Sequence, residues 1–239
     1  NCTDANLRGN FSGANFTNAN LTGVLLANSN LTDTNLTYTT LSGIRSSGGI
    51  VGNPALPDGW ILASGYLVGF GSNLRGANLT GLDLSTATLT GVSSGRITGS
   101  PTLPSGWVLV NGYLVGPGAN LEDAELGAAN LTGASLIGAR LVHANLQEAN
   151  LVGVDLSGAN LQIAALVSAN LSCSNFTGAN LYGAWLGLTN LTGARFNGAD
   201  LSGGVDLTKA TVTNTDFTGS VLNGVSSGQL VGSPSHLPN

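Results

Sequence analysis

The acidic residues Glu122, Asp123 and Glu125 form the densest group of potential metal ligands in the sequence. A calcium ion takes about six to eight oxygen ligands, so these carboxylates could contribute to such a site. Three neighbouring carboxylates outside a dedicated binding loop are, however, more typical of a solvated edge. We therefore expect no metal and no other cofactor.

The remaining reactive side chains are few and scattered. The histidines are His143 and His236, and the cysteines are Cys2 and Cys173. Two cysteines are too few for a disulfide scaffold, and with two histidines they do not form a zinc-ligand pattern. No Ser, His and Asp arrangement can be proposed, so the sequence predicts a protein that is not an enzyme.

The composition restricts the possible partners. The chain has 239 residues with 36 glycines, 8% charged residues, one lysine at Lys209, and a net charge of −5. Nothing in this balance favours nucleic-acid phosphates or an anionic membrane surface. No apolar stretch approaches the length that spans a bilayer.

A repeat of five residues must position these side chains. From Asn130 to Leu161 every fifth residue is Leu, and the residue two positions before it is Ala or Val. In a helix a step of five advances roughly 140° around the axis, and in a strand an odd step reverses the face. Neither element gathers the leucines on one side. A chain that turns a corner every five residues does, and such coils stack into a solenoid.

The repeat is most regular from Leu121 to Leu201. This block has 17 central residues, all Leu except Phe176 and Phe196, and Ala stands two positions before 14 of them. A fixed side-chain volume at that position indicates close packing inside a narrow tube. Shorter blocks with the same period span 11–41, 74–89 and 207–222.

The segments "HANLQEANL" and "TGANLYGAWL" resemble the pentapeptide repeat family, whose pattern is Ala, Asp or Asn, Leu and two variable residues. The resemblance implies an all-β fold, a right-handed quadrilateral parallel β-helix with four pentapeptides per coil. With the central residues counted above, we expect about eight coils in one continuous solenoid.

Two segments that interrupt the repeat are copies of one another. Ser46–Leu74 and Ser93–Leu121 are offset by 47 residues and are identical at 19 of 29 positions. Each ends in two short apolar runs around a Ser-Gly or Asn-Gly pair, which predicts a β-hairpin. Because one coil of 20 residues separates the copies, each is expected to insert 27 residues. Their aromatic residues Trp60, Tyr66, Trp107 and Tyr113 either pack locally or contact a partner.

These patterns divide the chain into six parts. They are N-terminal coils at 1–45, a hairpin insertion at 46–73, a single coil at 74–92, a second hairpin insertion at 93–120, the main coils at 121–225, and a tail at 226–239. The tail begins a third copy of the insertion. We expect the chain to be a piece of a longer repeat protein, the alternative being a natural end inside the third copy.

Stacked coils would align residues that are 20 positions apart. Asn130, Asn150, Asn170 and Asn190 should therefore form one ladder of amides. Such ladders commonly satisfy hydrogen bonds between coils. Alternatively, a flat ladder could recognise ice or a surface polysaccharide.

The start of the chain, "NCTDANL", resembles the start of secreted bacterial pentapeptide proteins. This resemblance and the low charge favour a structural scaffold outside the cytoplasm or on the cell surface of a bacterium. Open solenoid ends favour self-association, end to end into a fibre or through the hairpins. The alternative is the DNA mimicry of gyrase-binding members of the family, which needs a continuous acidic face.

Overall fold

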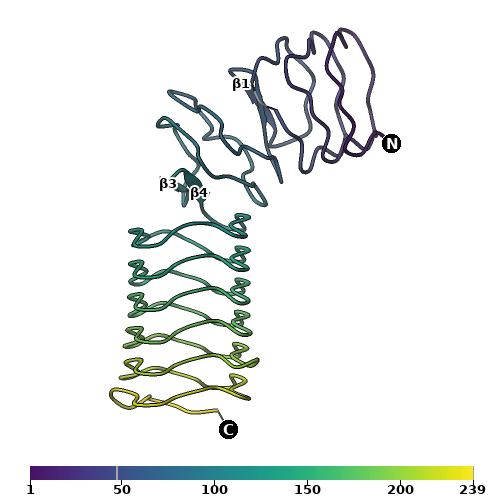
Figure 1. Ribbon diagram of the computed structural model, residues 1–239. Coiled ribbons are helices and arrows are strands. Elements are labelled where there is room, and N and C mark those ends of the chain that lie inside the picture. The colour runs from purple at the N-terminus through teal and green to yellow at the C-terminus, as the bar shows by residue number, and fades with distance from the viewer. Residues whose placement is uncertain (47, 239) are drawn as a thin grey trace. The chain divides into compact units, whose positions relative to one another are not determined.

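The computed structural model describes residues 1–46 and 48–238, which form two compact units (Figure 1). Unit 1 comprises Asn1–Ser105 with Gly112–Leu114, and unit 2 comprises Gly106–Asn111 with Val115–Asn239. In each unit the chain winds into stacked coils that meet through parallel β-bridges. Both units are therefore all-β solenoids.

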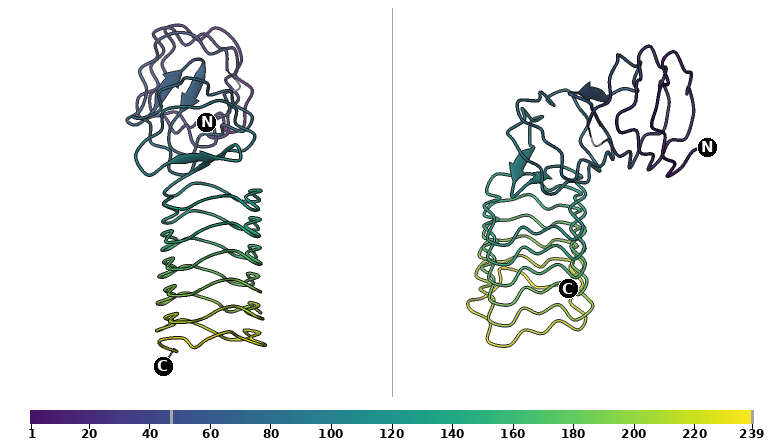
Figure 2. Two further views of the ribbon diagram at one scale, coloured as in Figure 1. Left: turned by 90° about the vertical axis from the view of Figure 1, so that its left-hand side faces the viewer. Right: turned by 45° about the horizontal axis from the view of Figure 1, so that its top comes forward.

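Unit 2 has four columns of bridged residues, one on each side of the coil (Figure 2). The columns begin at Asn120, Glu125, Asn130 and Ser135 and end at Val221, Ser226, Val231 and His236. Successive members of a column are 20 residues apart, or 21 where the chain passes the additional residue near Gly203. A coil of this unit therefore contains four pentapeptides, as the family resemblance implies.

The interior of unit 2 is filled by the central residues and by the small residues two positions before them. Leu161, Leu166, Ala164 and Ala169 are all buried, and the same holds along the regular block. Where Phe replaces Leu, the rings lie one above the other. Phe196 stacks on Phe176 with ring centroids 4.6 Å apart and on Phe217 at 5.2 Å.

The backbone connects each coil to the next at every side. The Leu141 N–H donates to the Asn160 carbonyl at 2.6 Å, and the Asn160 N–H donates back to the Ala139 carbonyl at 2.9 Å. The Ala144 N–H closes the corner on the Leu141 carbonyl at 3.0 Å. The corner residue between them, His143, has a φ of 57°, in the left-handed region that favours glycine.

The predicted 27-residue insertions are wrong, because most of each segment forms a coil. In unit 1 Val51 pairs with Asn30 and Ala55 pairs with Asn35, so 46–60 continues the solenoid wall. The column then passes from Arg45 to Asn73, a step of 28 residues, only eight more than a regular coil. In the second copy, Thr98 and Thr102 likewise pair with Asn78 and Asp83.

The tail forms wall in the same way. Ser226, Val231 and His236 pair with Asp206, Thr211 and Asp216, so three sides of a coil are present there. One column of unit 1 has five members, and the columns of unit 2 have six. The expectation of about eight coils is therefore too low, because the segments at 46–73, 93–120 and 226–238 were not counted.

The additional residues of each copy form an antiparallel hairpin. In the first copy β1 (Ile61–Ala63) pairs with β2 (Tyr66–Val68), and in the second β3 (Val108–Val110) pairs with β4 (Tyr113–Val115). The β1–β2 hairpin is part of the unit 1 wall: the Ile50 N–H donates to the Gly65 carbonyl at 3.4 Å, and the Asn78 N–H donates to the Tyr66 hydroxyl at 3.2 Å. The hairpin therefore lies between two coils on this side.

A core prediction follows from the phenylalanine stack. Phe196→Ala should lower the free energy of unfolding by about 3–5 kcal/mol, because it removes a buried ring that packs on two others. Urea or thermal unfolding monitored by circular dichroism would measure the loss. The control Tyr38→Ala removes an exposed ring and should change stability by less than about 0.5 kcal/mol. Equal effects of the two substitutions would contradict the assigned core.

Candidate interaction surfaces

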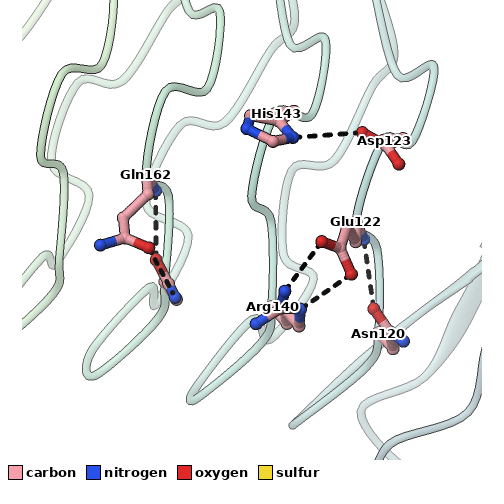
Figure 3. Close-up of polar contacts among 7 residues, drawn as sticks. Asn120, Glu122, Asp123, Arg140, His143 and Gln162 are labelled. Carbon is pink, nitrogen blue, oxygen red and sulfur yellow. Dashed lines mark hydrogen bonds and ion pairs between the residues drawn. The ribbon is translucent and has the colours of Figure 1, made fainter.

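The acidic cluster is bound by side chains of the next coil instead of converging on an ion (Figure 3). Arg140 donates to both Glu122 oxygens, from Nε at 3.0 Å and Nη2 at 2.8 Å, and this hydrogen bonding raises the pKa of Arg140. Asn145 donates to Glu125 at 2.9 Å, and His143 Nδ1 lies 3.4 Å from Asp123. Each carboxylate thus has a different partner. No group of three or more His, Cys, Asp or Glu in the described residues is placed to hold a metal.

The other reactive side chains are dispersed. His236 Nδ1 lies 3.8 Å from Asp216 at an exposed side of the last coil. Cys2 is half-buried and Cys173 is exposed, and both are free thiols. This arrangement supplies no nucleophile paired with a base.

The predicted asparagine ladder is present in unit 2. Asn130, Asn150, Asn170 and Asn190 occupy successive positions of one column, followed by Thr211. The Asn190 amide donates to the Asn170 side-chain oxygen at 3.3 Å. Each side-chain oxygen also accepts the N–H two residues on, as Asn190 accepts from Thr192 at 3.1 Å. The ladder therefore supports the corners and the stacking, and a ligand role for it remains a prediction.

The hairpin aromatics are half-buried within their own segments. Trp60 packs over Gly69 and Trp107 over Gly116, so closely that any added Cβ would overlap the indole. Tyr66 is bonded to the next coil as described above, and Tyr113 lies against Gly95. These contacts favour local packing of the four rings. Their use as partner contacts stays a prediction.

A side-wall patch in unit 2 was not predicted from the sequence. Tyr182, Trp185 and Leu188 lie on one coil, and Ile163 lies on the preceding coil beside Gly183; all four side chains are exposed. Tyr182 and Trp185 were read as isolated decoration because other aromatics are distant in sequence. The 20-residue step was the signal that could have grouped them with Ile163.

An apolar cavity at the last coil of unit 2 was also missed. Its volume is about 240 Å³. The lining residues are Leu207, Val212, Phe217, Leu222, Val225, Ser227, Leu230, Pro234 and Leu237. These residues continue the solenoid interior, so the cavity is the open end of the core.

The repeat itself decides the family. The model of the family described as "Pentapeptide repeats" matches eight copies, over residues 10–45, 70–93, 124–162, 169–203 and 189–224. The chain belongs to the pentapeptide repeat family. A comparison with curated proteins finds no match. Within the described residues of this pentapeptide repeat protein, no helix is long and apolar enough to cross a membrane.

Solved structures of other pentapeptide repeat proteins are similar to this chain. A thylakoid-lumen protein of Arabidopsis thaliana is 32% identical over 41% of this chain and 68% of its own, with a TM-score of 0.40. HetL of Nostoc sp. strain PCC 7120, a protein involved in heterocyst differentiation regulation, is 24% identical over 94% of this chain and 85% of its own, with a TM-score of 0.32. QnrB1, a plasmid-mediated fluoroquinolone resistance protein, is 16% identical over 93% and 89%, with a TM-score of 0.29. With TM-scores this low, the family assignment rests on the repeat match.

The side-wall patch contains a strained residue whose replacement is informative. Ile163 is β-branched and has a φ of 57°, a conformation that costs roughly 1–2 kcal/mol for such residues. Ile163→Gly should therefore stabilise unit 2, by up to about 1 kcal/mol after the flexibility of glycine is counted. The matched control is Ile137→Gly, an exposed Ile at a corner with ordinary φ, which should destabilise. Thermal unfolding measures both, and a loss of stability in Ile163→Gly would contradict the assigned corner geometry.

Asp216 gives a pH prediction. The Thr218 hydroxyl and N–H donate to its carboxylate at 2.6 and 2.9 Å, and with Asn197 they lower its pKa from 3.8 to about 2. Because the folded pKa is depressed, the stabilisation is complete above pH 4 and is lost as the pH falls towards 2. Asp216→Asn should remove this part of the acid destabilisation. Unfolding midpoints between pH 7 and 2 test it, and equal acid slopes in both proteins would refute it.

Proposed function

We propose that the protein is a non-enzymatic structural scaffold, outside the cytoplasm or on the cell surface of a bacterium, that associates end to end. The observation that carries this proposal is the open apolar core at the last coil of unit 2. The simplest partner is a second copy of the chain. The low charge and the secreted-type start of the sequence support the location.

The backbone at this end supports association. In inner coils the N–H of the central residue donates to the following coil, as the Leu207 N–H donates to the Ser226 carbonyl at 2.7 Å. At Leu222 no following coil exists among the described residues. An edge with unused backbone groups beside an apolar cavity is a template for further polypeptide.

The first coil of unit 1 also leaves core residues partly accessible. Leu7, Phe11 and Phe16 are half-buried, whereas Leu21, Leu31 and Leu36 of the following coils are buried. A chain with two different open ends can associate head to tail, and such contacts produce filaments unless the rotation closes a ring.

Gyrase binding by DNA mimicry is the weaker alternative. It requires a continuous negative face, but none of the four columns of unit 2 places two carboxylates next to each other. Glu122 is also neutralised by Arg140. Inhibition of gyrase supercoiling by the purified protein would support this alternative.

Recognition of a surface polysaccharide is a second candidate, and the side-wall patch favours it. Exposed Trp185 and Tyr182 are amphipathic rings that can contact the apolar face of a sugar. Glycan-array binding that is lost in Trp185→Ala and retained in Tyr38→Ala would support it.

The end-to-end proposal is tested by charging the open core. The full chain should form concentration-dependent oligomers or filaments, seen by light scattering and negative-stain electron microscopy. Leu230→Lys, at the cavity, should weaken association by roughly tenfold or more, since it places a charge in the apolar contact. Leu188→Lys, an equally exposed leucine on the side wall, should leave association unchanged. A monomeric wild-type chain at all concentrations would reject the proposal.

A further inference from the structure

The open core of unit 2 has two covered counterparts in the same chain. Ser226–Leu230, "SSGQL", aligns with Ser46–Ile50 and Ser93–Ile97, and all three segments form the same side of a coil. The inward residue of this side is Ile50 in the first copy, Ile97 in the second and Leu230 in the third. Their exposed fractions are 3%, 6% and 40%. The third copy thus lacks a cover that the other two possess.

The structure shows what the cover is in the first copy. Leu67 of strand β2 lies in one buried cluster with Ile50, and Leu62, Trp60 and Leu56 pack against that cluster. The β1–β2 hairpin is therefore the element that closes the core over Ile50. Leu237, which aligns with Leu56 after one additional residue, is 63% exposed in the third copy.

A buried serine fixes the hairpin in both complete copies. The Leu67 N–H donates to Ser46 Oγ at 3.0 Å, and the Leu114 N–H of strand β4 donates to Ser94 Oγ at 2.9 Å. Both serines are buried. The residue that aligns with Ser94 in the third copy is Ser227, and it lines the open cavity. The cavity thus combines an apolar floor with an acceptor at the position of the hairpin contact.

We propose that this cavity is a docking site for a β-hairpin of the Gly-Trp-(Ile/Val)-Leu…Gly-Tyr-Leu-Val type, carried by another polypeptide. In the complex its Tyr-Leu-Val strand places the Leu side chain over Leu230 and Leu237, and the N–H of that Leu donates to Ser227 Oγ. The proposal rests on the proposed function only in treating this end as an association site. It names a different occupant from the bare first coil of a second copy.

The hairpins of this chain are not the source of the occupant. Leu67 and Leu114 are fully buried in place, and the serine contacts hold both strands. Releasing either hairpin would open a core that is already closed. A separate polypeptide that carries the same pattern has no such cost.

The test uses the full 239-residue chain and a fluorescently labelled peptide with the sequence of residues 58–73, "DGWILASGYLVGFGSN". A backbone-cyclised form of the peptide is measured in parallel, so that poor hairpin formation does not hide binding. Fluorescence anisotropy should show saturable binding. The same peptide with Trp60→Ala and Leu67→Asp should bind at least roughly tenfold more weakly, because both apolar anchors are lost.

Variants of the chain locate the site. Leu237→Lys and Ser227→Ala should each weaken peptide binding, the former by roughly tenfold or more. Leu188→Lys is the matched control and should bind the peptide as the wild-type chain does. Absence of saturable binding by both peptide forms, or equal binding to Leu237→Lys and wild type, would overturn the proposal.

Electron microscopy on the same samples separates the two proposals. Filaments that form normally while neither peptide binds would leave end-to-end association standing and reject the hairpin site. Saturable, Leu237-dependent peptide binding by a chain that stays monomeric would support the hairpin site and reject association between copies. Binding that also prevents filament formation would support both, since the two occupants compete for one end.

Discussion

The internal width of the coil is the constraint on which the structure depends. An inward Ala and an inward Leu in every pentapeptide fill the cross-section, and their nearly constant volume allows one coil to lie directly on the next. That stacking aligns residues 20 positions apart and lets each backbone group find its partner in the adjacent coil. Surface features such as the asparagine ladder and the Glu122–Arg140 pair are consequences of this alignment.

The hairpin segments show how much variation this constraint permits. The first copy replaces regular pentapeptides with Ile50 and a proline-containing stretch, yet Val51 and Ala55 keep their places in the columns. The additional eight residues are accommodated because Leu67 supplies buried apolar surface and Ser46, Gly65 and Tyr66 supply hydrogen bonds. A wall can therefore be widened where both the core and the backbone partners are replaced.

The period of five was sufficient to predict the solenoid, the inward residues and the asparagine column. It was not sufficient at 46–60, 93–105 and 226–238, because a coil requires one inward apolar side chain and extended backbone per side, and Ile50 meets this without the Ala-X-Leu pattern. The patch around Trp185 was missed for a related reason. Its members are distant in sequence, and only the stacking register brings Ile163 beside Gly183.

A stacked fold of this kind has no internal signal that ends it, because every coil presents the next one with the same edge and the same apolar floor. What can cover an end is then set by the chemistry of the last coil. In this chain that coil is of the hairpin-bearing type: Leu230, Leu237 and Ser227 stand where the complete copies bind a hairpin, and a regular pentapeptide coil brings no N–H to the serine. The end is thus more selective than an ordinary coil, and the same residues that leave the core open also determine what fits it.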